Sequence, residues 1–120
     1  MKKIPLNKLV ANPLNPNVMS EEVFEKLKSN IKNQKGKYPA IIVREINGKY
    51  RIIDGHNRRR ALEELGYKEA KCDIWDVDDE TEKTILATIN ELKGTQDLVK
   101  RASLIKTILD LGVKRRKLVG

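Results

Sequence analysis

A glycine between an apolar strand and a basic helix is the feature that most constrains the fold of this chain. Residues 52–62 read Ile-Ile-Asp-Gly-His-Asn-Arg-Arg-Arg-Ala-Leu, so a strand ends, the chain turns at Gly55 and a helix begins at once. The strand is the second arm of an expected hairpin, because Asn47-Gly48 suits the two positive-φ positions of a tight turn. Residues 39–44 supply the first arm. This alternation of strands and helix favours a mixed α/β fold.

The apolar periodicity predicts further elements around that segment. In chain order they are extended segments at 4–6 and 9–10, a helix from the N-cap Ser20 to 33–36, a strand at 71–77, and helices ending at Gly94 and Gly112. Gly66 is expected to end the helix that follows Gly55. Asp79, with Glu82 three residues further on, resembles a capping arrangement. We therefore expect a compact mixed-sheet domain of the α/β (α+β) class, with extra helices at its C-terminal end.

Charge limits the kinds of partner. The 120 residues hold 25 Lys and Arg against 17 Asp and Glu, and the net charge of +8 divides into +7 in residues 1–53, −5 in 54–97 and +6 in 98–120. Such a chain suits anionic partners such as nucleic acid or nucleotides, although a lysine-rich composition also serves solubility alone. The basic run at 114–117 has the same two interpretations, a solvated tail or a contact with phosphates. Aromatic residues make up only 4%, which argues against a stacking platform for single strands.

Residue counts exclude several kinds of site. One cysteine (Cys72) excludes an internal disulfide and a cysteine zinc cluster, and one histidine (His56) excludes a multi-histidine metal centre. The acidic residues between 73 and 82 invite a nuclease metal site, but capping and turn chemistry explain Asp78 and Asp79 without a metal. No apolar run approaches the roughly 20 residues of a membrane span, and a signal peptide is lacking, so we expect a cytoplasmic protein.

The start of the helix after Gly55 is the strongest candidate site. Its free backbone N–H groups and the helix dipole favour an anion at this position. Three consecutive arginines, residues 58–60, oppose the dipole there, and a bound phosphate would resolve the conflict with bidentate hydrogen bonds. The alternative is that these arginines extend into solvent or pair with Glu63 and Glu64.

Two residues beside Gly55 are candidates for chemistry. His56 is either a packing or capping residue, or a phosphate donor and proton shuttle. Asp54 is either the N-cap of the helix, or a base or magnesium ligand. The residues themselves leave these alternatives open.

Three segments, with a fainter fourth at 88–93, make the chain resemble the N-terminal domain of ParB, in the ParB/sulfiredoxin superfamily. They are Asn-Pro-Leu-Asn-Pro-Asn at 12–17, Gly-Lys-Tyr-Pro-Ala-Ile-Ile-Val-Arg at 36–44, Asp-Gly-His-Asn-Arg-Arg-Arg-Ala at 54–61, and Thr-Ile-Asn-Glu-Leu-Lys at 88–93. The third is similar to the phosphate box Gly-Glu-Arg-Arg-x-Arg-Ala of the family. Asn17 replaces an arginine that usually ends the first box, and Ile89 replaces an acidic residue that helps to hold Mg²⁺.

The resemblance implies a nucleoside triphosphate ligand, CTP first, with Mg²⁺ and at most weak hydrolysis. The implied nucleotide-binding residues are Val43, Arg44, Gly55, His56, Asn57, Arg58, Arg59 and Asn90. Asn90 and Glu91 are the implied metal ligands. The implied role is DNA partition or DNA-associated regulation, with DNA and a second copy of the chain as partners. We expect a nucleotide-binding domain at 1–112 and a basic tail at 113–120. ParB proteins carry a DNA-reading domain next, so the domain here either stands alone or belongs to a longer protein that is interrupted in this tail.

Other members of the superfamily imply alternatives. The Asp-Gly-His-x-Arg form also resembles the free-serine kinase branch, which would make Asp54 and His56 catalytic beside Arg58 and the ligand an adenine nucleotide. Sulfiredoxins carry a catalytic cysteine where this chain has His56, and Cys72 lies in a different expected strand. A third class is a DNA-binding module, or a nuclease, that needs no nucleotide.

Overall fold

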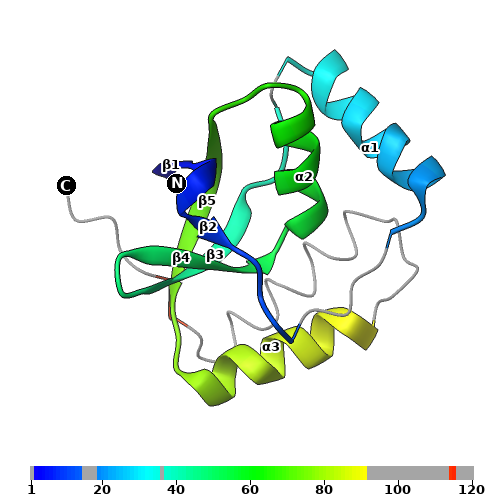
Figure 1. Cartoon of the computed structure of the whole chain (residues 1–120). Helices are drawn as coiled ribbons and strands as arrows, with labels where there is room; N and C mark the ends of the chain where they lie inside the picture. Colours follow the sequence, from blue (N-terminus) through cyan, green and yellow to red (C-terminus); the bar gives the residue numbers. More distant parts are fainter. Residues whose placement is uncertain (1, 15–18, 36, 92–113, 116–120) are drawn as a thin grey trace.

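In the computed structural model, the hairpin before Gly55 forms the middle of a curled mixed sheet (Figure 1). The structure describes residues 2–14, 19–35, 37–91 and 114–115. Its elements are β1 (Lys2–Pro5), the 3₁₀ helix η1 (Leu6–Lys8), β2 (Leu9–Val10), α1 (Glu21–Asn33), β3 (Ile41–Ile46), β4 (Lys49–Asp54), α2 (His56–Glu64), β5 (Glu69–Asp76), α3 (Asp79–Glu91) and β6 (Lys114–Arg115). The strand order is β1-β5-β3-β4-β2, and β6 pairs with β5.

Local turn chemistry explains the central topology. Asn47 and Gly48 have φ of 52° and 81°, which confirms the predicted tight turn between the antiparallel strands β3 and β4. The chain then crosses through α2 to β5, which lies parallel to β3 on its other side. The predicted α/β class is therefore confirmed, with β1 antiparallel to β5 and β2 parallel to β4 at the two edges.

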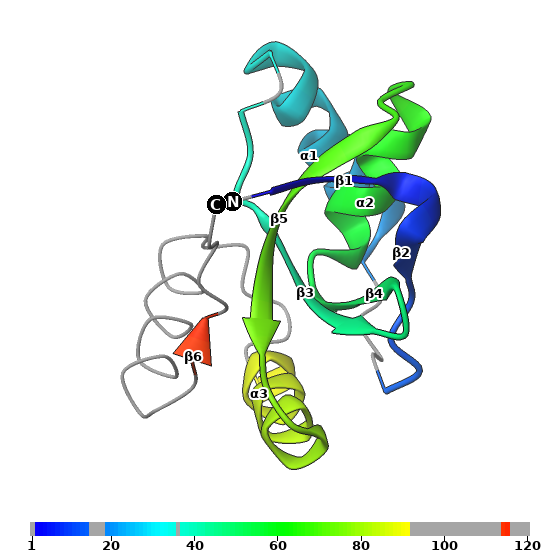
Figure 2. The same ribbon diagram turned by 90° about the vertical axis from the view of Figure 1, so that its left-hand side faces the viewer.

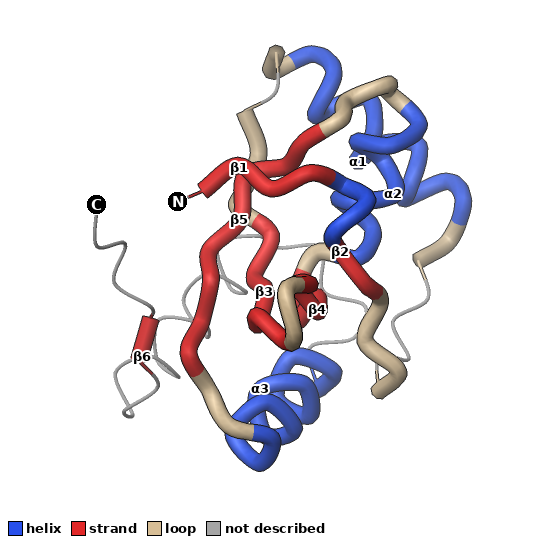
Figure 3. Tube along the Cα trace, turned by 60° about the vertical axis from the view of Figure 1, so that its left-hand side comes forward, coloured by secondary structure: helices blue, strands red, loops and turns tan. Residues whose placement is uncertain are grey.

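Helices cover both faces of the sheet (Figure 2, Figure 3). Alternation along the strands sends Ile41 and Val43 to one face and Ile42 to the other. The first face forms the larger core with α1 and α2, whose buried members include Phe24, Ile31, Ala61 and Leu62. The second face packs on α3 through Ile42, Ile53, Trp75, Ile85, Leu86 and Ile89. Burial on both faces explains why the central strands read as continuous apolar runs.

The helix starts show one confirmed cap and one correction. Ser20 caps α1 as predicted, because its Oγ accepts a hydrogen bond from Val23 N at 3.2 Å. The capping arrangement predicted for Asp79 and Glu82 is wrong. Asp78 caps α3 instead, since its Oδ1 accepts from Thr81 N at 2.7 Å, and Glu82 is buried at the sheet. Ion pairs with the partly buried Arg44 and Arg51 override the capping propensity of the Glu82 carboxylate.

The C-terminal part of the chain is described only in part. The sequence pattern gave no sign of β6, whose two residues pair with Trp75 and Asp76. The helix predicted to end at Gly112 lies outside the described residues, as do residues 116–117 of the basic run. Across the described ranges, no helix is both long and apolar enough to cross a bilayer.

Candidate anion-binding site

Gly55 forms the turn from β4 into α2 because no other residue fits its conformation without strain. Its φ is 115°, and a Cβ built there would lie 3.1 Å from both Ile41 Cγ1 and Arg58 Nη2. The helix begins at His56 with no side-chain cap and no acidic residue in its first turn. The first N–H groups of α2 therefore offer donors for an anion.

Arg58 is buried beneath this turn, with a relative exposure of only 8%. Its Nη2 donates to Asp54 Oδ2 at 3.3 Å and to the Ala40 carbonyl oxygen at 3.4 Å, both long contacts. Its Nε is buried and has no hydrogen-bond partner. Asp54 is also buried, so it acts in this state as the partner of Arg58 rather than as a solvent-accessible base.

The other two arginines of the run lie in different environments. Arg59 approaches Glu63 at 3.8 Å, and its Nε is likewise buried without a partner. Arg60 pairs with Glu64 and with Glu21 of α1, each at 3.1 Å, and its guanidinium lies 3.8 Å from the centroid of the Phe24 ring.

Pairing with Glu63 and Glu64, the alternative left open by the sequence, thus describes Arg59 and Arg60. Arg60 fastens α2 to α1. Arg58 and Arg59 each retain a buried donor near the start of α2.

His56 accepts a hydrogen bond from another part of the chain. The backbone N of Asn12 donates to Nε2 of His56 at 3.0 Å, which assigns the proton of the neutral ring to Nδ1. Burial lowers the pKa of His56; the Arg59 charge lowers it further, and the Asp54 charge raises it. His56 therefore stays neutral near pH 7 and ties the loop after β2 to the start of α2.

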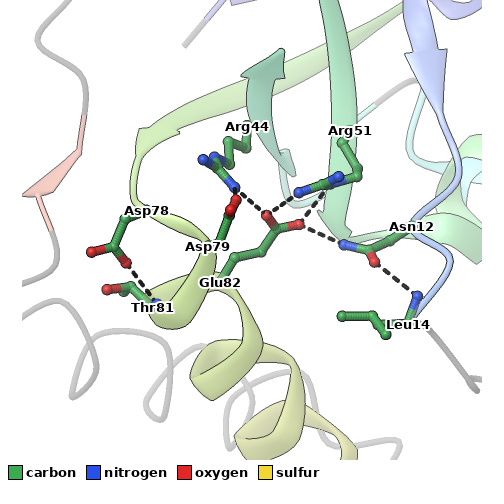
Figure 4. Close-up of polar contacts among 8 residues, drawn as sticks. All are labelled: Asn12, Leu14, Arg44, Arg51, Asp78, Asp79, Thr81 and Glu82. Atoms are coloured by element: carbon green, nitrogen blue, oxygen red, sulfur yellow. Dashed lines mark hydrogen bonds and ion pairs between the residues drawn. The ribbon is translucent and has the colours of Figure 1, made fainter.

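Asn12 continues this connection to α3 through a buried carboxylate (Figure 4). Its Nδ2 donates to Oε2 of Glu82 at 2.7 Å, and its Oδ1 accepts from Leu14 N at 3.0 Å. Glu82 also binds Arg44, at 2.7 Å, and Arg51 through both carboxylate oxygens. Burial alone would raise the pKa of Glu82, but the hydrogen bonds from Arg51 and Arg44 outweigh it and the pKa is lowered.

This network was not predicted, although the register contains a signal for it. A two-residue turn at Asn47-Gly48 places Arg44 directly opposite Arg51. Two like charges on opposite strand positions repel each other unless a carboxylate lies between them. Glu82 is that carboxylate, and its place over the hairpin follows only from the packing of α3.

The remaining predicted residues lie in several places. Val43 is fully buried in the larger core, so any ligand contact falls to its backbone. Arg44 is bound to Glu82 and to Asp79, 2.6 Å away. Asn57 is in the first turn of α2. Asn90 and Glu91 end α3, and their side chains lie outside the part of the chain that the structure describes. Among the described residues, no group of three His, Cys, Asp or Glu side chains is arranged to hold a metal.

Cys72 lies in β5 opposite Ile41 of β3, not at the start of α2, and is buried in the larger core. Burial, together with the Asp73 charge, raises the pKa of its thiol to about 12. The cysteine chemistry of the sulfiredoxin branch therefore has no counterpart at the start of α2, where His56 stands.

Fold and site together define a class: mixed α/β domains that present a strand–glycine–helix turn lined by arginine. The chain matches the ParB N-terminal domain over residues 1–92 and belongs to this family. A relative by sequence is the nucleoid occlusion protein of Geobacillus sp. (strain WCH70), 30% identical over 113 residues. The match covers 92% of this chain but only 40% of that protein, so the chain spans less than half the length of this relative.

Solved structures agree with this assignment. C-terminally truncated ParB from Caulobacter crescentus, crystallised with CTP-gamma-S, is 26% identical with a TM-score of 0.66, covering 92% of this chain and 63% of that one. The same truncated protein has been crystallised with the centromeric parS site. Sulfiredoxin from Arabidopsis thaliana is 26% identical with a TM-score of 0.59, covering 71% of this chain and 94% of that one. The predicted ParB/sulfiredoxin-like architecture is therefore confirmed.

Proposed function

We propose that the start of α2 binds the phosphates of a nucleoside triphosphate. The observation that carries the proposal is the pair of buried, unpartnered Nε atoms of Arg58 and Arg59. A buried N–H without an acceptor costs about 1–3 kcal/mol, which a bound oxyanion would recover. The uncapped first turn of α2 adds free backbone N–H groups, which also attract an anion.

CTP is the nucleotide we propose first. Support comes from the Caulobacter crescentus ParB, which has been crystallised with a CTP analogue and shares its fold with this chain. Gly55, His56, Asn57, Arg58 and Arg59 would contact the phosphates. Val43 and Arg44 would border the nucleoside. Asn90 would approach the phosphates, and Asn90 with Glu91 would hold Mg²⁺, whose chemistry there is to neutralise phosphate charge.

Similarity to ParB proteins also supports a DNA-associated role. The relatives are named for nucleoid occlusion and chromosome partitioning. We propose that residues 1–112 act as a nucleotide-binding domain in partition or a related regulatory process. The domain would act on DNA through a partner, a further domain or self-association.

The kinase alternative is weaker because of Asp54. A base for phosphoryl transfer must reach the hydroxyl of a substrate, yet Asp54 is 5% exposed and paired with Arg58. The Asp54 carboxylate is placed instead to orient the Arg58 guanidinium. The kinase alternative remains an outcome of the experiment below.

The test is thermal unfolding with CTP, ATP, ADP and GTP, each with and without Mg²⁺. A ligand at 100 times its Kd stabilises the folded state by about 2.7 kcal/mol, a shift in Tm of about 10 °C for a domain of this size. We expect CTP with Mg²⁺ to give this shift. We expect Arg59→Gln, whose side chain is partly exposed, to reduce it severalfold, and Arg58→Gln to abolish it.

Arg60→Gln is the matched control, since Arg60 belongs to the same run but contacts Glu21, Glu64 and Phe24. It should lower the Tm of the free chain and leave the nucleotide shift intact. A shift with an adenine nucleotide that needs a small hydroxyl substrate for turnover, and is lost in Asp54→Asn, would favour the kinase branch. The absence of any shift would overturn the proposal.

A further inference from the structure

Six lysines gather at the end of the molecule opposite the start of α2. They are Lys3, Lys32, Lys35, Lys37, Lys68 and Lys71. Figure 1 places the C-terminal ends of α1 and α2 and the start of β5 together at this end. Two ion pairs explain this arrangement: Glu21 with Arg60, and Lys28 with Glu64. They show that α1 and α2 run in the same direction.

Contacts between neighbouring elements bring these lysines onto one surface, here called the lysine end. Lys3 lies directly opposite Lys71 in the pairing of β1 with β5. The Lys71 ammonium lies 4.7 Å from the Tyr38 ring centroid, and the Tyr38 hydroxyl accepts from Lys71 N at 2.9 Å. The Lys68 carbonyl accepts from Leu6 N at 2.9 Å, which fixes Lys68 beside the end of β1.

The lysine end carries an excess of positive charge among the described residues. None of the six lysines takes part in an ion pair there. Carboxylates on the elements of this end include Glu63 and Glu64, engaged by Arg59, Arg60 and Lys28, and Glu69 and Asp73, which flank Lys71 on β5. The helix dipole stabilises a lysine at the C-terminal end of α1, but it offers no such stabilisation to the lysines on β1 and β5. Lys3 opposite Lys71 costs stability unless an anion bridges them.

We propose that the lysine end binds the phosphodiester backbone of double-stranded DNA. A duplex offers one negative charge per about 1.7 Å of axis, which suits lysines spread over helix ends, a loop and two strands. An acidic peptide is less suited, since peptide recognition uses apolar pockets, and Tyr67 (39% exposed) is the one large exposed hydrophobic at this end of the described chain. The surface deepens the DNA-associated role proposed above and does not depend on the nucleotide site.

The test measures binding of the 120-residue chain to a fluorescent 20-base-pair duplex, without nucleotide, over a range of salt concentrations. The patch variant is Lys35→Gln, Lys37→Gln and Lys68→Gln, all exposed. The control variant is Lys26→Gln, Lys49→Gln and Lys83→Gln, which removes the same charge away from the lysine end. The slope of log K against log salt should become shallower by about 0.9 per lost phosphate contact, hence by about 2 to 3 in the patch variant.

We expect the patch variant to lose at least tenfold in affinity at low salt and the control variant to lose less than threefold. Equal losses would overturn the proposal, as would a duplex that fails to bind at low salt. A poly-glutamate peptide that binds as tightly as the duplex, and competes with it, would assign the surface to an acidic protein instead. Thermal shift with CTP, run in parallel on the patch variant, tests the nucleotide site separately.

Discussion

The side-chain amide of Asn12 donates a hydrogen bond to Glu82 at 2.7 Å, although the two residues are 70 positions apart. Through its backbone N, the same residue also donates to His56 at the start of α2. One asparagine therefore connects α3, the loop after β2 and the candidate site. Because Glu82 also binds Arg44 and Arg51, these connections depend on a single buried carboxylate.

Replacing Glu82 with glutamine should destabilise the fold markedly. The change removes the only carboxylate found to bind both Arg44 and Arg51 in the described residues, and leaves Arg44 with the exposed Asp79 alone. We expect a loss of about 2 kcal/mol, less than the roughly 3–5 kcal/mol of fully buried pairs, because both arginines stay partly solvated. Urea unfolding measures it. Asp79→Asn is the control, since Asp79 binds the same Arg44 but its side chain is 79% exposed. Equal losses in the two variants would contradict the assignment.

Replacing Gly55 with alanine should cost more than replacing Gly48. Both have positive φ, but a Cβ at Gly48 meets nothing within 4 Å, whereas one at Gly55 contacts Ile41 and Arg58 at 3.1 Å. Gly48→Ala should cost about 1 kcal/mol for backbone strain, and Gly55→Ala about 2–3 kcal/mol. Thermal unfolding compares them, and a larger effect at Gly48 would exclude the steric argument.

Stability should fall as the pH drops below about 6.5. Because the pKa of His56 is lowered on folding, the unfolded chain takes up this proton first, so stability is full above the ordinary pKa of 6.5 and declines below it. The pKa of Glu82 is also lowered, which adds a second decline below its ordinary 4.5. Urea unfolding between pH 3 and 8 should show both declines. His56→Gln should remove only the first, and an unchanged profile would rule out His56 as its source.

The thiol of Cys72 should be unreactive in the folded chain. Burial raises its pKa to about 12, so the thiolate fraction at pH 8 is about one in ten thousand, and the side chain is fully enclosed. A disulfide exchange reagent should label the native chain only at the rate of unfolding and label the urea-unfolded chain within the mixing time. Rapid labelling of the native chain would place Cys72 at an accessible surface.

Much of the fold could be predicted because its signals are local. The turn at Asn47-Gly48, the cap at Ser20 and the strand–glycine–helix segment each depend on the conformations of a few neighbouring residues. The separate roles of the three consecutive arginines could not be predicted, because the three side chains lie in different surroundings. Arg58 is buried, while Arg60 extends over Phe24, and only the packing of α1 against α2 separates them.

The sequence by itself thus determined the order of strands and α-helices from β1 to α3, the tight turn and the position of Gly55, since backbone sterics and periodicity act over short distances. The tertiary structure alone decided that Asp78 and not Asp79 caps α3, and that Glu82 joins Arg44, Arg51 and Asn12. It also decided which lysines share one end of the molecule. These relationships depend on how distant elements pack, and burial of a charge is defined only once its partners have been brought to it.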